Sequence, residues 1–492
     1  MQRRSFLRRV TGQAPAPASP PGHAAALHAL QTEDNVLPYN QGLAPYVPDD
    51  TFVPWNEQRV LHLLRRTGYR ITVERVYDLL AMPPADAVDA LVDAAVAAPM
   101  PARPSYYDFP YGQGHPDFPV VQGYRDVVKF SYRQALELDA PGTGLRERMV
   151  MALSNLLVVE YRANQRPSVL YRYVERLRTH ALGNLRTLIT EIGRDDPAMV
   201  LYLNSHRNEV SAPNENYARE LLELFTMGPI GPDGTPNYTE TDIQELARAL
   251  TGWRARINED AIDTRFLAGR FDDGEKTIFG RTGNWGYDDA LAIVFEERGP
   301  QIAHYLSRRL YQAFVCDVAS EAVVAEMAAV MLANDFEVVP VLRVLLKSRH
   351  FLDTDAFGVR YRSPFDLFVS FYGSRDITDD EFLNNLHALV FQLAPPFNPP
   401  DVSGWPSGRA WIDTASLDVR VDSLSRIASW SAGRYKVLGR SMPTPDDPYI
   451  LAEELAIFFT PVPFDRETLA IGTEVLLGGS QDYMWSIDNP SA

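Results

Sequence analysis

Residues 214–228 read NENYARELLELFTMG and form the most strongly patterned stretch of the chain. Apolar side chains recur in it at the i, i+4, i+7, i+8 spacing of one helix face: Tyr217, Leu221, Leu224 and Phe225. Asparagine suits the residue that precedes a helix, and glycine suits the one that follows it. We therefore predict an amphipathic helix that is capped by Asn214 or Asn216, ends at Gly228 and packs its apolar stripe against a core.

A second stripe of the same helix is polar. Its members lie three or four residues apart: Asn216, Arg219, Glu220 and Glu223. Side chains at this spacing share a helix face, so they could all meet one ligand. Two carboxylates one turn apart can share a metal ion or a proton, but they can also pair with Arg219 and with arginines of adjacent helices. The residue types favour the ion-pair network.

A second helix is expected to follow and to form a helical hairpin with the first. Thr239 and Asp242 have the spacing of a capping box, and apolar residues recur from there to Leu250. Gly252 ends this helix, and Trp253 is expected to pack back onto it.

The best strand signal lies at about residues 264–280. Residues 264–267 and 277–279 flank Asp272-Asp273-Gly274, an Asp-Gly turn that predicts a β-hairpin. The loop continues to Asn284 and is rich in carboxylates and glycines, but it lacks the alternating ligands of a helix–loop–helix calcium site. A hairpin turn with a surface loop is therefore favoured over calcium binding.

Helical periodicity dominates the rest of the chain from Trp55 onward. We predict a mainly α fold, a large helical globule with a small β-hairpin and loop excursion near residues 264–286. A single large α-helical domain is expected over residues 51–492, after a basic, Pro-rich, disordered tail over residues 1–50. The main predicted helices are 84–98, 122–138, 143–164, 167–193, 287–315, 318–334, 337–349, 363–373, 378–393, 413–431, 448–461 and 465–477.

Composition excludes several classes of protein. The chain has 492 residues, 46% of them hydrophobic, which is ample for a large core. A formal net charge of −17 argues against nucleic-acid binding, and no stretch approaches the roughly 18 apolar residues of a membrane span. The lone cysteine, Cys316, excludes an intramolecular disulfide and a thiolate zinc site, and we expect it in the core.

The nine histidines form no HExxH motif and no i, i+4 pair. No Gly-x-Ser-x-Gly nucleophile elbow is present either. We therefore predict no metal ligands and no cofactor, although carboxylates could still hold a metal of unknown identity.

Residues 395–411 read PPFNPPDVSGWPSGRAW, an irregular segment fixed by prolines and glycines. Two tryptophans and an arginine, Trp405, Trp411 and Arg409, offer stacking surfaces. Such a loop suits the binding of a sugar ring or an aromatic group, and it suits closure over a core equally well.

Taken in order, these and other motifs resemble the bacterial domain of unknown function 1800 family over about residues 55–480. The stretches that carry the resemblance are 62–69 (HLLRRTGY), 180–184 (HALGN), 196–199 (DPAM), 214–228, 249–253 (ALTGW), 274–280 (GEKTIFG) and 404–411 (GWPSGRAW). The family has no established reaction. The resemblance implies export by the twin-arginine route and a sulfatase-like partner protein encoded alongside.

The N-terminus bears on export. Residues 3–9 read RRSFLRR, the twin-arginine pattern of a signal for exporting folded proteins. The apolar stretch that should follow is poor and interrupted by prolines, so a disordered basic tail is the competing interpretation. We expect a periplasmic or exported location, with a cytoplasmic one as the alternative.

The chain departs from the family pattern at its chemically promising positions. Where the family typically carries Phe-Trp-His-Asn-His-Phe, residues 152–157 read ALSNLL, so that Ser154 and Leu156 replace the two histidines and only Asn155 is kept. A histidine common at the start of the Asp-Asp-Gly loop is Phe271, and an aspartate common after Tyr-Leu is Asn204. The resemblance thus implies a lost or altered activity.

Two functions follow from these patterns. The first is an exported or envelope-associated accessory or binding protein for a carbohydrate or protein ligand, with a degenerate family site. The alternative is an exported hydrolase that uses carboxylates of the 214–228 helix and the 271–284 loop. The candidate catalytic residues are Glu215, Glu220, Glu223, Asp272 and Asp273. The candidate binding residues are Asn216, Arg219, His180, Lys276, Asn284, Trp253, Trp405, Arg409 and Trp411.

Overall fold

The computed structural model describes residues 42–49, 53–110, 127, 143–161, 165–373, 393–406, 408–430 and 432–488. In these residues α-helices dominate, and β-structure is limited to two antiparallel two-stranded sheets. The predicted mainly α fold is therefore confirmed. The twin-arginine segment lies outside the described residues, as do nearly all of the helices expected at 122–138 and 378–393.

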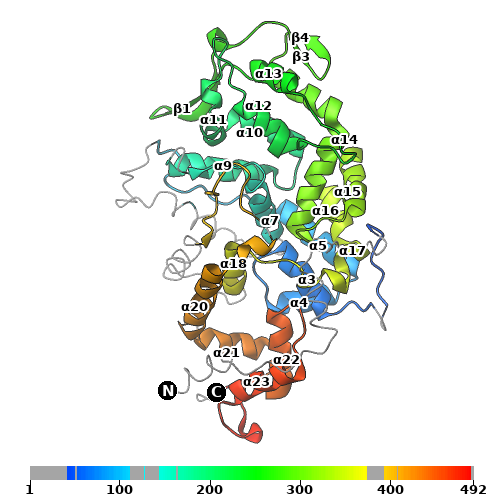
Figure 1. Cartoon of the computed structure of the whole chain (residues 1–492). Coiled ribbons are helices and arrows are strands. Elements are labelled where there is room, and N and C mark those ends of the chain that lie inside the picture. The colour runs from blue at the N-terminus through cyan, green and yellow to red at the C-terminus, as the bar shows by residue number, and fades with distance from the viewer. Residues whose placement is uncertain are drawn as a thin grey trace.

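The helices form three tiers along the long axis of the molecule (Figure 1). The middle tier holds α3 (Glu57–Thr67), α4 (Val73–Leu80), α5 (Pro84–Ala97), α7 (Thr143–Ser154) and α9 (Pro167–His180). Beyond α9 lie α10 (Leu185–Asp195), α11 (Pro197–Tyr202), α12 (Asn216–Glu220), α13 (Glu240–Ala249) and the strands. At the other end lie α21 (Ala432–Ser441), α22 (Pro448–Phe459) and α23 (Arg466–Leu477), while α18 (Pro364–Gly373) and α20 (Thr414–Trp430) lie level with α3 and α4.

One long helix flanks the upper two tiers. This is α14 (Tyr287–Phe314), which is kinked at Arg298, two residues before Pro300, as expected for a proline inside a helix. Beside it lie α15 (Glu321–Ala333), α16 (Val338–Leu346) and the short α17 (Arg349–Leu352). Cys316 follows α14 and is buried, as predicted.

The 214–228 segment is helical as predicted, but its second half is a π-helix, Leu221–Thr226. A π-helix has wider turns than an α-helix, and the Thr226 hydroxyl spans one of them by donating to the Leu221 carbonyl five residues back, at 2.6 Å. The predicted apolar stripe is buried apart from Leu224, which is half-buried. Gly228 ends the segment with φ +72°, the left-handed conformation that favours glycine.

The single helix expected at 167–193 is wrong, because it is divided into α9 and α10. Asn184 ends the break and caps α10, with its side chain accepting from the Thr187 amide at 3.1 Å. The Leu185 amide donates to the Phe336 carbonyl at 3.0 Å, so a tertiary contact replaces a helical one.

The predicted strand pairing across Asp272-Asp273-Gly274 is also wrong. The first sheet pairs β1 (Trp253–Asn258) with β2 (Ala261–Phe266), and the second pairs β3 (Lys276–Ile278) with β4 (Arg281–Gly283). Each strand thus pairs with its nearer neighbour. The β3–β4 turn has positive φ at both central residues, Phe279 (49°) and Gly280 (82°), as a tight hairpin requires.

One hydrophobic core runs through the described residues, from Leu43 to Ile487. Its first members lie before the expected boundary at residue 51, since the Tyr46 amide donates to the Lys347 carbonyl at 2.9 Å. None of the helices in the described ranges is long and apolar enough to cross a bilayer.

Candidate functional site

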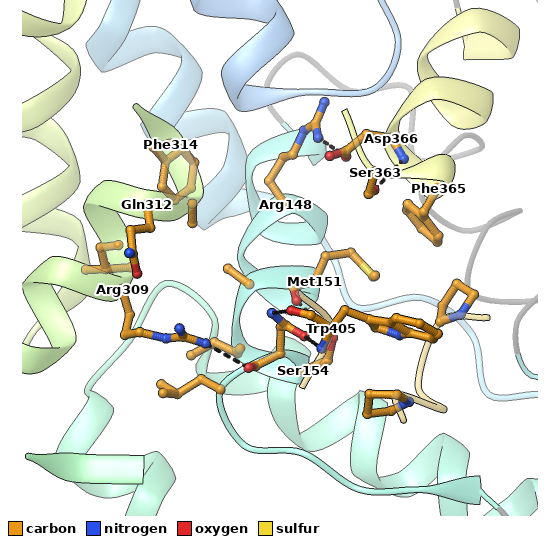
Figure 2. A pocket seen from close by; sticks show the side chains of 18 of the residues that line it. Arg148, Met151, Ser154, Arg309, Gln312, Phe314, Ser363, Phe365, Asp366 and Trp405 are labelled. Carbon is orange, nitrogen blue, oxygen red and sulfur yellow. Dashed lines mark hydrogen bonds and ion pairs between the residues drawn. The ribbon is translucent and has the colours of Figure 1, made fainter. Parts of the chain in front are cut away.

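A cavity of about 160 Å³ lies where α7, α14, residues 360–366 and the 394–411 loop converge (Figure 2). Its wall includes residues 151–156 at the end of α7, so it contains Ser154, Asn155 and Leu156. The family resemblance places histidines at the first and last of these three positions. The altered family motif therefore forms part of a cavity wall.

Asn155 holds the 394–411 loop, the tryptophan loop, against this wall. Its amide oxygen accepts from the Trp405 backbone N–H at 2.6 Å, and its amide nitrogen donates to the Trp405 carbonyl at 3.2 Å. Gly404 allows the close approach: its φ is +91°, and a Cβ there would lie 2.6 Å from the Asn155 side-chain oxygen. The retained asparagine thus has a structural role.

The two predicted tryptophans line the cavity together. The rings of Trp405 and Trp411 lie 5.9 Å apart between centroids, with 37° between their planes. Arg409, predicted to bind with them, is exposed and is not part of the lining. The loop therefore brings two of its three predicted binding residues to the cavity.

Arg148 forms a buried polar anchor on the opposite side of the cavity (Figure 2). Its guanidinium donates to the carbonyls of Arg65 and Gly68, at 3.0 and 2.8 Å, and forms an ion pair with Asp366. Burial raises the pKa of the Asp366 carboxyl, but Arg148, Arg360 and Arg362 outweigh burial and hold that pKa below its ordinary value. Asp366 is therefore an ionised partner of arginine at neutral pH.

Two polar groups in the lining are buried without a hydrogen-bond partner, and Arg360 is a third with donors to spare toward the described residues. The Tyr69 hydroxyl and the Trp405 indole nitrogen are buried without a hydrogen bond. Arg360 is half-buried and acts on Asp366 through its charge, but no hydrogen bond joins its side chain to the described part of the chain. Since buried polar groups are normally paired, these donors are available to a ligand.

The candidate carboxylates of the 214–228 segment lie elsewhere. Arg219 pairs with Glu215 at 3.2 Å and with Glu240 of α13 at 2.5 Å. Glu223 accepts from the Tyr238 hydroxyl at 3.5 Å. Burial and the neighbouring charge of Glu223 raise the pKa of Glu220. None of them lines the cavity.

The candidate residues of the 271–284 loop form a structural turn. Asp272 pairs with Arg248 of α13 at 2.8 Å and accepts from the Gly274 amide. Lys276 is 1% exposed and donates to the Asp272 and Gly274 carbonyls, at 2.5 and 2.8 Å. Asp273 and Asn284 are exposed.

Three other predicted binding residues make local contacts. The His180 imidazole lies 3.0 Å from the Glu191 carboxylate, one helix along. The Asn216 side chain donates to the Leu203 carbonyl at 3.1 Å. Trp253 is the first residue of β1. Its ring contacts Phe266 of β2 and Tyr287 of α14.

Tyr69, Arg148 and Arg360 line the cavity but were not predicted from the sequence. Tyr69 ends one of the family motifs, which was the available signal. The two arginines belong to no pattern, because they are 212 positions apart and meet only in the folded chain. Among the described residues, no group of three or more His, Cys, Asp or Glu side chains is arranged to hold a metal ion.

Comparison with known families agrees with the motifs. The model of the family described as "Protein of unknown function (DUF1800)" matches residues 62–481. No curated protein and no solved structure matches the chain. The family match spans most of the sequence and includes α7, α14 and the tryptophan loop around the cavity, and the chain therefore belongs to the DUF1800 family.

Proposed function

We propose that this protein is a binding protein that holds a small ring-shaped ligand, a sugar residue or an aromatic ring, in the cavity between α7 and the tryptophan loop. The observation that carries the proposal is the Trp405–Trp411 pair in the cavity wall. Indole rings stack on the faces of sugars and aromatic groups, and each buries a large apolar area. The aromatic pair favours a ring over an extended chain.

The size of the cavity limits the ligand. A cavity of about 150 Å³ is known to accept benzene, and this one has about 160 Å³. One six-membered ring therefore fits, and an oligosaccharide would have to extend beyond the cavity. The lining is mixed, with apolar side chains such as Met151 and Phe365 beside hydrogen-bonding ones such as Ser363 and Gln312 (Figure 2).

The test is a titration of the purified protein with monosaccharides and small aromatic compounds, followed by tryptophan fluorescence and calorimetry. Trp405→Ala and Trp411→Ala should each weaken binding by ten-fold or more, in line with the loss of an aromatic contact. Trp285→Phe is the matched control, because Trp285 lies beside β4 and outside the lining. Equal binding by all three variants would disprove the role of the tryptophan pair.

We also propose that the protein acts in the cell envelope, with residues 3–9 as its export signal. Replacing Arg3 and Arg4 by lysine should retain the protein in the cytoplasm, as cell fractionation would show. Co-purification from the native host would test the sulfatase-like partner. An unchanged distribution of the double-lysine variant would remove the export proposal and leave the binding proposal intact.

The hydrolase alternative keeps one supporting observation, the raised pKa of Glu220. A raised carboxyl pKa is typical of a general acid, but structural carboxylates show it too. Glu220→Gln would abolish any hydrolytic activity found with sugar-based substrates. Trp405→Ala would leave that activity unchanged if the two sites are independent.

A further inference from the structure

Positive charge accumulates around the cavity in a protein whose formal net charge is −17. Arg148, Arg309 and Arg360 line the cavity, and among the described residues of its lining the carboxylates are Asp317 and Asp366. Three further arginines outside the lining interact electrostatically with these groups or with one another: Arg65, Arg66 and Arg362. Among the described residues, these six guanidinium groups therefore outnumber the two carboxylates of the lining.

The excess is not neutralised by the next carboxylate along the chain. Glu147, beside Arg148, is committed to a buried two-bond ion pair with Arg178, at 2.6 and 3.0 Å. Burial, and then the charges of other arginines, lower the pKa values of Arg65 and Arg66 to about 9. The positively charged arginines repel one another, and an anion bound among them would relieve this repulsion.

The arginines differ in how far their donors are already used. Arg148 is committed to carbonyls and to Asp366, and Arg309 gives one bond to the Asn155 carbonyl at 3.0 Å. Arg360 makes no hydrogen bond with the described residues. Hydrogen bonds to the described residues therefore use none of its five N–H donors, which form the planar fork that matches a carboxylate or a phosphate.

The two buried, unpaired groups of the lining are also donors. Burial raises the pKa of the Tyr69 hydroxyl, so this group keeps its proton at neutral pH. The Trp405 indole N–H can only donate. A ligand with acceptor oxygens can accept from both groups.

We propose that the cavity recognises an anionic oxygen group on its ligand, a carboxylate or a phosphate, which Arg360 binds with support from the Tyr69 hydroxyl and the Trp405 indole N–H. This inference rests on the proposed function, which supplies the ring of the ligand, and it adds a negatively charged group to that ring. The ligand class is then a single ring that carries one acidic group, such as a sugar acid or a sugar phosphate.

Matched ligands test the charge directly on the full-length protein. Glucuronate and glucose differ in one carboxylate, and glucose 6-phosphate adds a phosphate to the same ring. Calorimetric titration should give glucuronate or glucose 6-phosphate at least ten-fold tighter binding than glucose, as charge-assisted hydrogen bonds imply. The comparison of the two acids also distinguishes a carboxylate site from a phosphate site.

Variants then assign the charge to its residue. Arg360→Gln should weaken binding of the acidic sugar at least ten-fold and leave glucose unaffected, and Arg360→Lys should recover part of the loss. Tyr69→Phe should weaken the acidic sugar to a smaller extent. Arg308→Gln is the matched control, because Arg308 lies on α14 beside Arg309 but pairs with Glu321 and does not line the cavity. Circular dichroism confirms that each variant is folded.

The outcomes separate the two proposals. Equal affinities for glucuronate, glucose 6-phosphate and glucose would overturn the anionic site and support the ring site. Binding of inorganic phosphate or acetate that Arg360→Gln abolishes, without any binding of rings, would support the anionic site and overturn the proposed function. Absence of binding by every one of these probes would overturn both.

Discussion

Asn155 and Gly404 illustrate how single residues shape the cavity. The asparagine side chain bonds both backbone groups of Trp405, and the glycine leaves room for it. A loop of prolines and glycines has few regular backbone hydrogen bonds. The two hydrogen bonds from Asn155, the Asn155 clamp, are therefore important for its conformation.

Asn155→Ala should therefore lower the free energy of unfolding by about 1–3 kcal/mol, because two backbone groups of Trp405 lose their partners. Urea denaturation followed by circular dichroism measures the loss. Ser154→Ala is the neighbouring control and should cost less, because the Ser154 hydroxyl only bonds the carbonyl three residues back. Equal losses in the two variants would contradict the clamp.

Asp196 predicts a specific dependence of stability on pH. It is fully buried at the start of α11, where its side chain accepts from the Ala198 and Met199 amides at 3.0 and 3.1 Å. Burial raises the pKa of its carboxyl to about 6, although Arg176 lowers it. The folded chain therefore binds this proton more tightly than the unfolded chain.

The stability that this proton contributes is present below the unfolded pKa of about 4 and is lost as the pH rises through about 6. Asp196→Asn keeps the capping oxygen and removes the titration. Wild type should thus lose stability relative to the variant between pH 4 and pH 7, by up to about 3 kcal/mol. Chemical denaturation at several pH values measures the difference, and a constant difference would refute the prediction.

At the scale of elements, helices were predictable where capping and periodicity agreed. The capping box of Thr239 and Asp242 opens α13 as expected, and Gly68 follows α3. The division between α9 and α10 was not predictable, because a contact to residue 336 creates it. Hydrophobic periodicity does not reveal a helix break at which tertiary hydrogen bonds satisfy the free backbone groups.

The strand pairing failed for a similar reason. Phe279 adopts φ +49°, which a bulky residue rarely does, so Gly280 is the single local signal of the tight β3–β4 turn. Two contacts stabilise it: the Phe279 amide donates to Asp242 at 3.0 Å, and the Arg298 guanidinium lies 4.3 Å from the ring centroid. The Asp-Gly signal was real but marks the turn capped by Asp272.

The β3 region yields an element-scale prediction. Lys276→Met should destabilise the protein by about 1–3 kcal/mol, because two carbonyls of the preceding turn lose a buried donor. Limited proteolysis should then cut within residues 271–275 faster than in wild type. Thr277→Ala is the control, since Thr277 is exposed and bonds only Thr282 through its side chain. Cleavage at the same rate in Lys276→Met and wild type would contradict the structural role of Lys276.

At the scale of the whole molecule, the cavity is assembled from segments that are distant in sequence. Residues near positions 69, 150, 310, 360 and 405 meet there. The tryptophan loop and the altered 152–157 motif could each be recognised in the sequence, the first by its prolines, glycines and tryptophans and the second by its departure from the family pattern. Their proximity and the arginine excess depend on helix packing, which a single sequence does not reveal. An acidic chain can thus contain a locally cationic site.

The same packing predicts that the described chain unfolds as one unit. A single hydrophobic core includes residues from both ends, and Arg65 of α3 donates to the Ile457 and Phe458 carbonyls of α22, at 2.8 and 3.0 Å. Far-UV circular dichroism and tryptophan fluorescence should therefore report one midpoint in urea, as cooperative unfolding requires. Arg65→Gln should separate the midpoints, because the C-terminal helices lose a half-buried link to α3 and melt first. Two midpoints already in wild type would mean that the C-terminal helices form an independent domain, whereas a single midpoint in both proteins would mean that the core alone couples them.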